Sequence, residues 1–217
     1  IVEFSGESDT ALAPRLQDLD AMMGDLGYPN AVVPVTDPSQ QKRVWGVREA
    51  GLNIVMAMKG SAKPVSVIED CAIPLEHLAD FTARVTDLFD KYQAGGTWYA
   101  HASVGLLHVR PILDMKQAEG AAKLRSIAEE TFAIVAEYGG SHSGEHGDGK
   151  VRSEFIEVMQ GPRLARAFEE IKDKFDPGGL FNPGNIVRPP KMDDRSLLRF
   201  KPDYTPVEIE TGLDWSP

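Results

Sequence analysis

The residues at positions 143–149 have the greatest potential for chemistry in this chain. Their sequence, Ser-Gly-Glu-His-Gly-Asp-Gly, places the carboxylate of Glu145 beside the imidazole of His146 in a glycine-rich loop. Glycine lets a backbone approach a ligand closely and adopt positive φ values. Two further histidines, His101 and His108, lie upstream. A divalent ion held by such groups, with a spare base beside it, can activate a hydroxyl group of a substrate.

The two upstream histidines can act together only if the chain folds back between them. On one straight strand their odd spacing would point them to opposite faces. The sequence around Gly105 instead predicts a hairpin that sets His101 and His108 nearly opposite each other. Two half-buried histidines with local hydrogen bonds are the plain alternative. With Glu145 and His146 counted, the pattern favours a metal or catalytic site, and ligands without cysteine suit zinc, manganese or iron(II).

Basic residues lie near these positions, and they are Arg48, Arg110, Lys150 and Arg152. Each is also compatible with ordinary surface charge. Near a metal they would form a carboxylate receptor, because a guanidinium group matches two carboxylate oxygens. The glycine loop lacks the Gly-x-x-x-x-Gly-Lys-Ser/Thr pattern, so it does not predict a nucleotide P-loop. We expect His142 and His77 at the surface.

The composition bounds the class of protein. The chain has 217 residues, of which 42% are hydrophobic and 26% charged, as in soluble globular proteins. The net charge of −10 argues against nucleic acid as a main partner. A single cysteine, Cys71, rules out a disulfide framework or a cysteine-based metal site within this chain. No apolar run approaches the roughly 20 residues of a membrane span. We expect a cytoplasmic protein and leave peripheral membrane association open.

Hydrophobic periodicity predicts an α+β fold with an antiparallel sheet covered by helices on one face. The expected helices are residues 10–26, 36–50, 74–92, 117–138 and 162–175. The expected strands are residues 1–4, 31–35, 54–58, 65–71, 97–103 and 106–113. The start at Ile1 without methionine and the proline-rich end suggest a piece of a longer protein. We expect one domain over residues 1–190 and an extended connector over 191–217 toward a further domain.

Three motifs in this order resemble the C-terminal domain of FAD-linked oxidases. They are the His-x6-His hairpin, the glycine loop and the run Asp-Pro-Gly-Gly-Leu-Phe-Asn-Pro-Gly at 176–184. This family includes D-lactate, glycolate and D-2-hydroxyglutarate dehydrogenases, and the resemblance runs from about Asp37 to Pro190. The stretches 44–52 and 108–110 look closest to the large members that carry a further iron–sulfur domain.

The resemblance implies a ferredoxin-like cap domain whose sheet lies over a flavin, with FAD bound mainly by a preceding domain of the same polypeptide. It implies that His101, His108 and Glu145 hold a divalent ion, zinc or manganese, and that His146 is the base. The substrate-binding residues expected on this basis are Arg48, Arg110, Lys150 and Arg152. The residues expected on the cofactor side are Gly147, Gly149 and Asn182.

The implied activity is oxidation of a small 2-hydroxy acid to the 2-oxo acid, with hydride transfer to FAD. The fragment alone is expected to be inactive because the dinucleotide site is missing. Arg110 departs from the family pattern, since members that use D-2-hydroxyglutarate often have asparagine two positions after the second histidine. A metal-dependent hydrolase and a non-catalytic interaction module are the alternative interpretations.

Overall fold

The computed structural model describes residues 1–205, 207 and 212–213, so Trp215 and much of the expected connector lie outside the described residues. The chain divides into two compact units, Ile1–Ile54 and Val55–Pro217. This division falls well before the expected boundary at residue 190, which stays a prediction. None of the described helices is long and apolar enough to cross a lipid bilayer.

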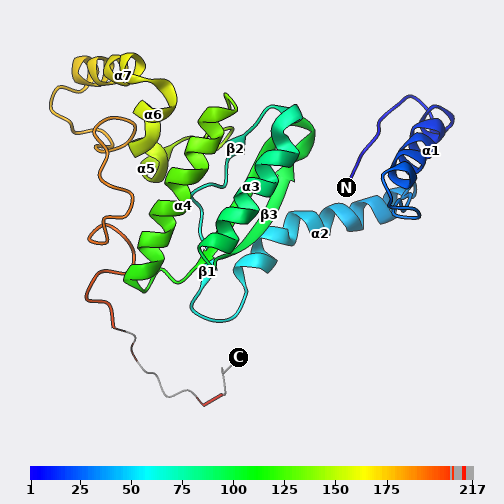
Figure 1. Ribbon diagram of the computed structural model, residues 1–217, viewed down its shortest axis with the longest axis horizontal. Coiled ribbons are helices and arrows are strands. Elements are labelled where there is room, and N and C mark those ends of the chain that lie inside the picture. Colours follow the sequence, from blue (N-terminus) through cyan, green and yellow to red (C-terminus); the bar gives the residue numbers. More distant parts are fainter. Residues whose placement is uncertain (206, 208–211, 214–217) are drawn as a thin grey trace. The chain divides into compact units, whose positions relative to one another are not determined.

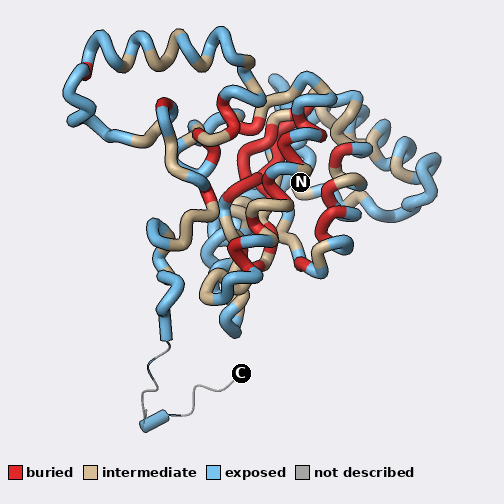
Figure 2. Tube along the Cα trace, turned by 60° about the vertical axis from the view of Figure 1, so that its left-hand side comes forward, coloured by how far each residue is buried: buried red, intermediate tan, exposed pale blue. Residues whose placement is uncertain are grey.

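The first unit consists of helices and connecting coil (Figure 1). Helix α1 (Asp9–Asp25) begins after Ser8, whose hydroxyl accepts the Ala11 N–H at 3.3 Å. Helix α2 (Pro38–Met56) begins two residues after the expected start at residue 36, and the Asp37 carboxylate accepts the Gln40 N–H at 2.9 Å. All residues of this unit are described and none is buried, in keeping with the pale blue and tan of its trace in Figure 2.

Three expected strands are wrong. Residues 1–4 and 31–35 are coil, and residues 54–56 form the last turn of α2, which runs past its expected end at Gly51. A β-rich run makes a strand only where a neighbouring strand offers backbone hydrogen bonds, and these segments have none in the described structure. A glycine inside a helix costs only about 1 kcal/mol relative to alanine, which is too little to end α2.

The second unit is built around one antiparallel sheet, which confirms the expected fold class. Its central strand is β4 (Leu106–Leu113), which pairs over Leu106–Ile112 with β3 (Gly95–His101) in the expected hairpin. On its other edge β4 pairs with two short strands, β1 (Lys63–Pro64) and β2 (Cys71–Ala72).

The segment between β1 and β2 bulges out of the sheet. Six residues, 65–70, span the interval that four residues, 108–111, cover on β4. The expected strand over residues 65–71 is therefore present only at its end. Such an insertion breaks the ladder and redirects side chains. Here it leaves Val67 and Ile68 fully buried and brings Glu69 and Asp70, also buried, against the site.

Helices α3 (Leu78–Lys91) and α4 (Ala118–Glu137) lie side by side over one face of the sheet (Figure 1). Both were expected, and each turns an apolar stripe inward. The buried stretches, red in Figure 2, gather in this layer. The largest fully buried apolar side chains are Phe81, Phe132, Ile68, Ile127, Val67, Val85, Val109 and Val135. Because Leu107 and Val109 point into this core, His108 and Arg110 must point to the opposite face.

The chain continues through α5 (Gly149–Arg152), α6 (Ile156–Gln160) and the expected helix α7 (Pro162–Phe175). Glu154 fastens the following segment to α4, since it accepts hydrogen bonds from Arg125 and from the N–H of Met192. Burial would raise the pKa of Glu154, but the contacts with Arg125, Lys191 and the Met192 N–H outweigh it and lower the pKa to about 2. The first residues of the expected connector are thus tied to the domain.

Gly105 is the position where the hairpin depends on glycine. Its φ is +74°, and a Cβ there would lie 2.0 Å from the carbonyl oxygen of Ile73. Gly139 has a similar φ of +66° but open space around it. We expect Gly139→Ala to cost roughly 1 kcal/mol of unfolding free energy and Gly105→Ala a further 1–3 kcal/mol or so, because only the latter adds a clash. Urea unfolding measures both, and equal losses would contradict this assignment.

Candidate metal and acid–base site

Three imidazoles of the second unit converge on one carboxylate oxygen. The Nε2 atoms of His108 and His146 each lie 3.3 Å from Oε1 of Glu145, and that of His101 lies 3.7 Å from it. All four residues were expected in the site from the sequence. They come from the hairpin and from the glycine-rich loop, on the sheet face that α3 and α4 leave uncovered.

The hairpin sets His101 and His108 on one face, although not directly opposite each other. His101 pairs with Leu106, and His108 pairs with Tyr99. The two histidines are therefore diagonal neighbours, with ring centroids 5.3 Å apart in an edge-to-face arrangement. A diagonal offset of two residues preserves the face, so the sequence-based expectation needs only this correction of register.

The loop that carries Glu145 and His146 is held by Asp70, which is fully buried. The Asp70 carboxylate accepts the N–H groups of Glu145 and His146 at 3.0 and 2.9 Å and faces the Ser143 hydroxyl at 3.2 Å. Its carbonyl accepts the Gly144 N–H at 2.8 Å. Sequence reasoning missed this role, although an acidic pair inside an apolar run was the available signal.

Gly144 packs closely against the hairpin. A Cβ at this position would lie 2.4 Å from Cδ1 of Leu106, so a side chain there would require the Leu106 side chain to shift. Gly147 and Gly149, expected on the cofactor side, have φ values of +78° and +54° with open space around them. They let the chain turn from His146 into α5.

The basic residues expected to bind substrate fall into different environments. Arg110 and Arg152 both contact the Glu69 carboxylate, at 3.3 and 2.9 Å, and Arg152 is buried and also donates to the Gly147 carbonyl. Lys150 is exposed on α5. Arg48 lies over the Trp45 ring in the first unit, so its part in the site stays a prediction.

The donor atoms fit a divalent cation. Two ligand atoms each about 2.1 Å from one tetrahedral ion lie about 3.4 Å apart, close to the separations around Glu145 Oε1. The Nδ1 of His108 lies 2.7 Å from the Glu69 carbonyl oxygen, which can only accept, so Nδ1 carries the proton. Nε2 of His108 is then an acceptor that faces another acceptor, Glu145 Oε1. A cation between them would stabilise this arrangement.

The described residues contain a second, overlapping set of possible ligands. Atoms of Asp70, His108, Glu145 and His146 all lie within 4.8 Å of one another. Asp70 already accepts backbone N–H groups of the loop, which leaves it less suited to a cation. His108 and Glu145 belong to both sets and therefore form the common centre of the candidate site.

His142 does not lie at the surface as expected. Its side chain is buried, edge-on to the Phe132 ring at 5.1 Å between centroids, with Nε2 3.2 Å from Oδ1 of Asp148. Burial lowers the pKa of His142 below its ordinary value of 6.5, although the nearby Asp148 opposes this shift. The pair joins the two ends of the loop that carries Glu145 and His146. His77 is half-buried and stacks on the Tyr138 ring.

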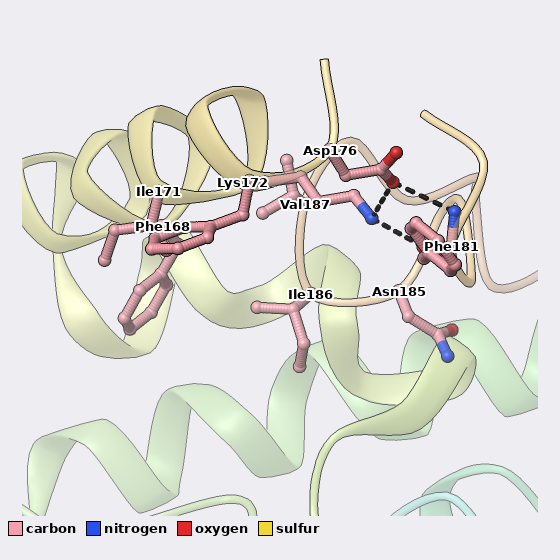
Figure 3. Close-up of a pocket in the computed structure, with 9 residues that line it drawn as sticks. Phe168, Ile171, Lys172, Asp176, Phe181, Asn185, Ile186 and Val187 are labelled. Carbon is pink, nitrogen blue, oxygen red and sulfur yellow. Dashed lines mark hydrogen bonds and ion pairs between the residues drawn. The ribbon is translucent and has the colours of Figure 1, made fainter. Parts of the chain in front are cut away.

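A separate groove of about 480 Å³ lies beneath α7 and is lined mainly by apolar side chains (Figure 3). Its charged groups are already paired, since Lys172 contacts Asp176 at 2.6 Å and Asp176 accepts the N–H groups of Leu180 and Phe181. These contacts, that with Lys172 foremost, lower the pKa of Asp176 to about 2. The groove therefore offers no free acid or base. Asn182, in the same loop, is exposed with a φ of +47°.

An antiparallel sheet with one helix-covered face and one face of converging imidazoles defines an α+β domain with a candidate metal site. The profile of the family described as FAD linked oxidases, C-terminal domain, matches residues 1–186. The match covers most of the chain, and the chain belongs to this family.

Curated relatives agree with this family. The D-2-hydroxyglutarate dehydrogenase of Escherichia coli (strain K12) is 32% identical over 198 residues, which cover 89% of this chain and 19% of that protein. The D-lactate dehydrogenase of Anaerostipes hadrus is 26% identical, over 86% of this chain and 38% of that protein. Glycolate oxidase subunit GlcD of Bacillus subtilis (strain 168) is 25% identical, over 71% of this chain and 33% of that protein. The chain spans about a fifth of the length of the D-2-hydroxyglutarate dehydrogenases that it matches.

The buried ring of His142 makes stability depend on pH. Unfolded His142 takes up a proton below pH 6.5, whereas the folded ring does so only at lower pH, so the free energy of unfolding falls as pH drops through this window. We expect His142→Phe, which keeps a ring against Phe132, to lose less stability between about pH 7.5 and pH 5 than the unsubstituted chain. Urea unfolding at a series of pH values tests this, and parallel profiles for the two chains would contradict it.

Proposed function

We propose that this chain is the substrate- and metal-binding part of a flavin-dependent dehydrogenase that oxidises a D-2-hydroxy acid to the 2-oxo acid. The observation that carries the proposal is the convergence of three imidazole Nε2 atoms on Glu145 Oε1. D-lactate, glycolate and D-2-hydroxyglutarate are the candidate substrate types, because relatives are named as enzymes for each of them.

The proposed assignment of ligands and base is the one that the resemblance to this family implies, and the convergence of the three imidazoles on Glu145 supports a site here. His101, His108 and Glu145 would hold the divalent ion, with zinc or manganese suited to imidazole and carboxylate ligands. His146 comes from the same loop as Glu145 and is half-exposed, so its Nε2 can reach a substrate hydroxyl. When bound, the ion supplies Lewis acidity that lowers the pKa of a hydroxyl group, and the flavin supplies two-electron acceptance.

The residues of this chain then act on the substrate in two ways. His146 takes the hydroxyl proton at Nε2 as the hydrogen on C2 departs with its electron pair, which leaves the C=O group of the product. Arg48, Arg110 and Lys150 are the proposed partners of the substrate carboxylate, and they would hold it in a fixed orientation. Arg152 is buried against Glu69, so we propose that it stabilises the site through its ion pair with Glu69.

The remaining cofactors would be bound mainly outside residues 1–217. FAD is proposed to bind mainly to a preceding domain of the same polypeptide, with Gly147, Gly149 and Asn182 on the cofactor side. An iron–sulfur cluster would need ligands from elsewhere, because the one cysteine, Cys71, is buried and burial raises its pKa to about 12. The proposed location is the cytoplasm.

Removing the proposed base should separate chemistry from metal binding. In the full-length enzyme we expect His146→Ala to slow flavin reduction by the D-2-hydroxy acid roughly 10²–10⁴-fold while stoichiometric metal is retained. His77→Ala is the matched control, because His77 stacks on Tyr138 outside the site. Stopped-flow absorbance of the flavin and elemental analysis measure the two properties. Unchanged flavin reduction in His146→Ala would remove the base assignment.

Removing a proposed metal ligand should release the metal as well as abolish the reaction. We expect His108→Ala to release the ion from the full-length enzyme and to abolish turnover, because His108 belongs to both possible ligand sets. Added zinc or manganese should restore the wild-type enzyme after chelation but not this variant. A metal-free wild-type enzyme that turns over at full rate would contradict the metal site, and hydrolysis without flavin reduction would favour a metal-dependent hydrolase.

A further inference from the structure

Glu69 contacts both imidazoles that flank Glu145 and does so through different atoms. Its backbone carbonyl oxygen lies 2.7 Å from Nδ1 of His108, and its carboxylate Oε2 lies 2.9 Å from Nδ1 of His146. The two rings stack with centroids 4.9 Å apart and an angle of 9° between their planes. One residue thus contacts the Nδ1 atoms of both rings.

The charges around Glu69 keep its carboxylate available to His146. Arg152 Nη1 contacts Oε1 at 2.9 Å, and Arg110 Nη2 contacts Oε2 at 3.3 Å. Glu69 and Asp70 together carry two negative charges, which these two arginines balance in a buried setting. A carboxylate oxygen accepts hydrogen bonds, so in a neutral His146 ring the proton lies on Nδ1, the nitrogen that faces Oε2 of Glu69.

We propose that Glu69 is a positioning residue that fixes His146 in the tautomer with an unprotonated Nε2. In this tautomer the lone pair of Nε2 faces the side where Glu145 and the proposed ion lie, ready to take a proton from a hydroxyl group. The same residue fixes His108, through its carbonyl, as a ligand-ready imidazole. The role in catalysis rests on the proposed function, whereas the tautomer assignment does not.

With Glu69 in this role, Arg152 and Arg110 act differently from the substrate-binding roles expected of them. Arg152 has both terminal nitrogens engaged, with Glu69, Asp70 and the Gly147 carbonyl. It holds the positioning carboxylate and the site loop together. Arg110 shares Glu69 but is less buried, so it can support Glu69 and still approach a substrate carboxylate.

The test uses the ring nitrogens of the histidines as reporters. The chain has five histidines, so ring-¹⁵N labelling gives five spin systems that single-histidine substitutions assign. At about pH 8, where histidine is mostly neutral, we expect both His108 and His146 of the metal-free chain to show the Nδ1–H tautomer. Glu69→Gln should move His146 toward the Nε2–H tautomer, because the amide has one acceptor oxygen for three donors. His108 should not change, because its partner is the backbone carbonyl.

The tautomer measurements can fail or succeed independently of the proposed dehydrogenase activity. An Nε2–H tautomer of His146 in the unsubstituted chain, or an unchanged His146 in both Glu69→Gln and Glu69→Ala, would overturn the proposal. Unchanged signals of His142, which is buried in the core, show that a variant has folded. In the full-length enzyme, Glu69→Gln should lower kcat roughly 10- to 100-fold with little change in KM or metal content, and a loss confined to KM would also overturn it.

Discussion

The site depends on two adjacent buried carboxylates, Glu69 and Asp70, balanced by the guanidinium groups of Arg110 and Arg152. An unpaired buried charge is costly, so these four groups must assemble together or not at all. Asp70 uses its acceptors to hold the backbone of the glycine-rich loop. The carbonyl oxygen of Glu69 contacts the imidazole of His108, and its carboxylate contacts the imidazole of His146 as well as the two arginines. The loop and the hairpin are thus fixed to the same two residues of one bulge.

The core explains why this bulge lies where it does. Val67 and Ile68 are fully buried beside the sheet, and they anchor the segment immediately before the two carboxylates. The strand pairs on either side of the bulge fix its ends on β4. One face of β4 therefore packs against α3 and α4, while the other presents His108 and Arg110. The packed helical layer on one face of the sheet keeps the polar side chains on the other face in fixed positions, as a catalytic or metal site requires.

The helices α3, α4 and α7 and the hairpin were predicted from the sequence because each depends on local patterns. The grouping of His101, His108 and Glu145 depends on distant parts of the chain, and it was implied by the resemblance to the FAD-linked oxidases. Periodic apolar residues predicted α3, α4 and α7, and Gly105 marked the turn. The bulge was not predictable, because an apolar run such as 65–71 looks like a plain strand unless its pairing partner is known. The acidic pair in this run was a signal that the two residues are unusual, but the partners of Asp70 and Glu69, and the burial of His142, depend on tertiary contacts.

In the proposed site, the imidazoles of His101 and His108 and the carboxylate of Glu145 hold a cation while the neighbouring imidazole of His146 stays free. Anomalous diffraction from crystals of the full-length protein, collected at the edge of the bound metal, tests it most directly. We expect an ion about 2.0–2.3 Å from Nε2 of His101, from Nε2 of His108 and from an oxygen of Glu145, with Nε2 of His146 outside bonding distance. An ion coordinated by His146, or a metal-free site in active enzyme, would contradict it.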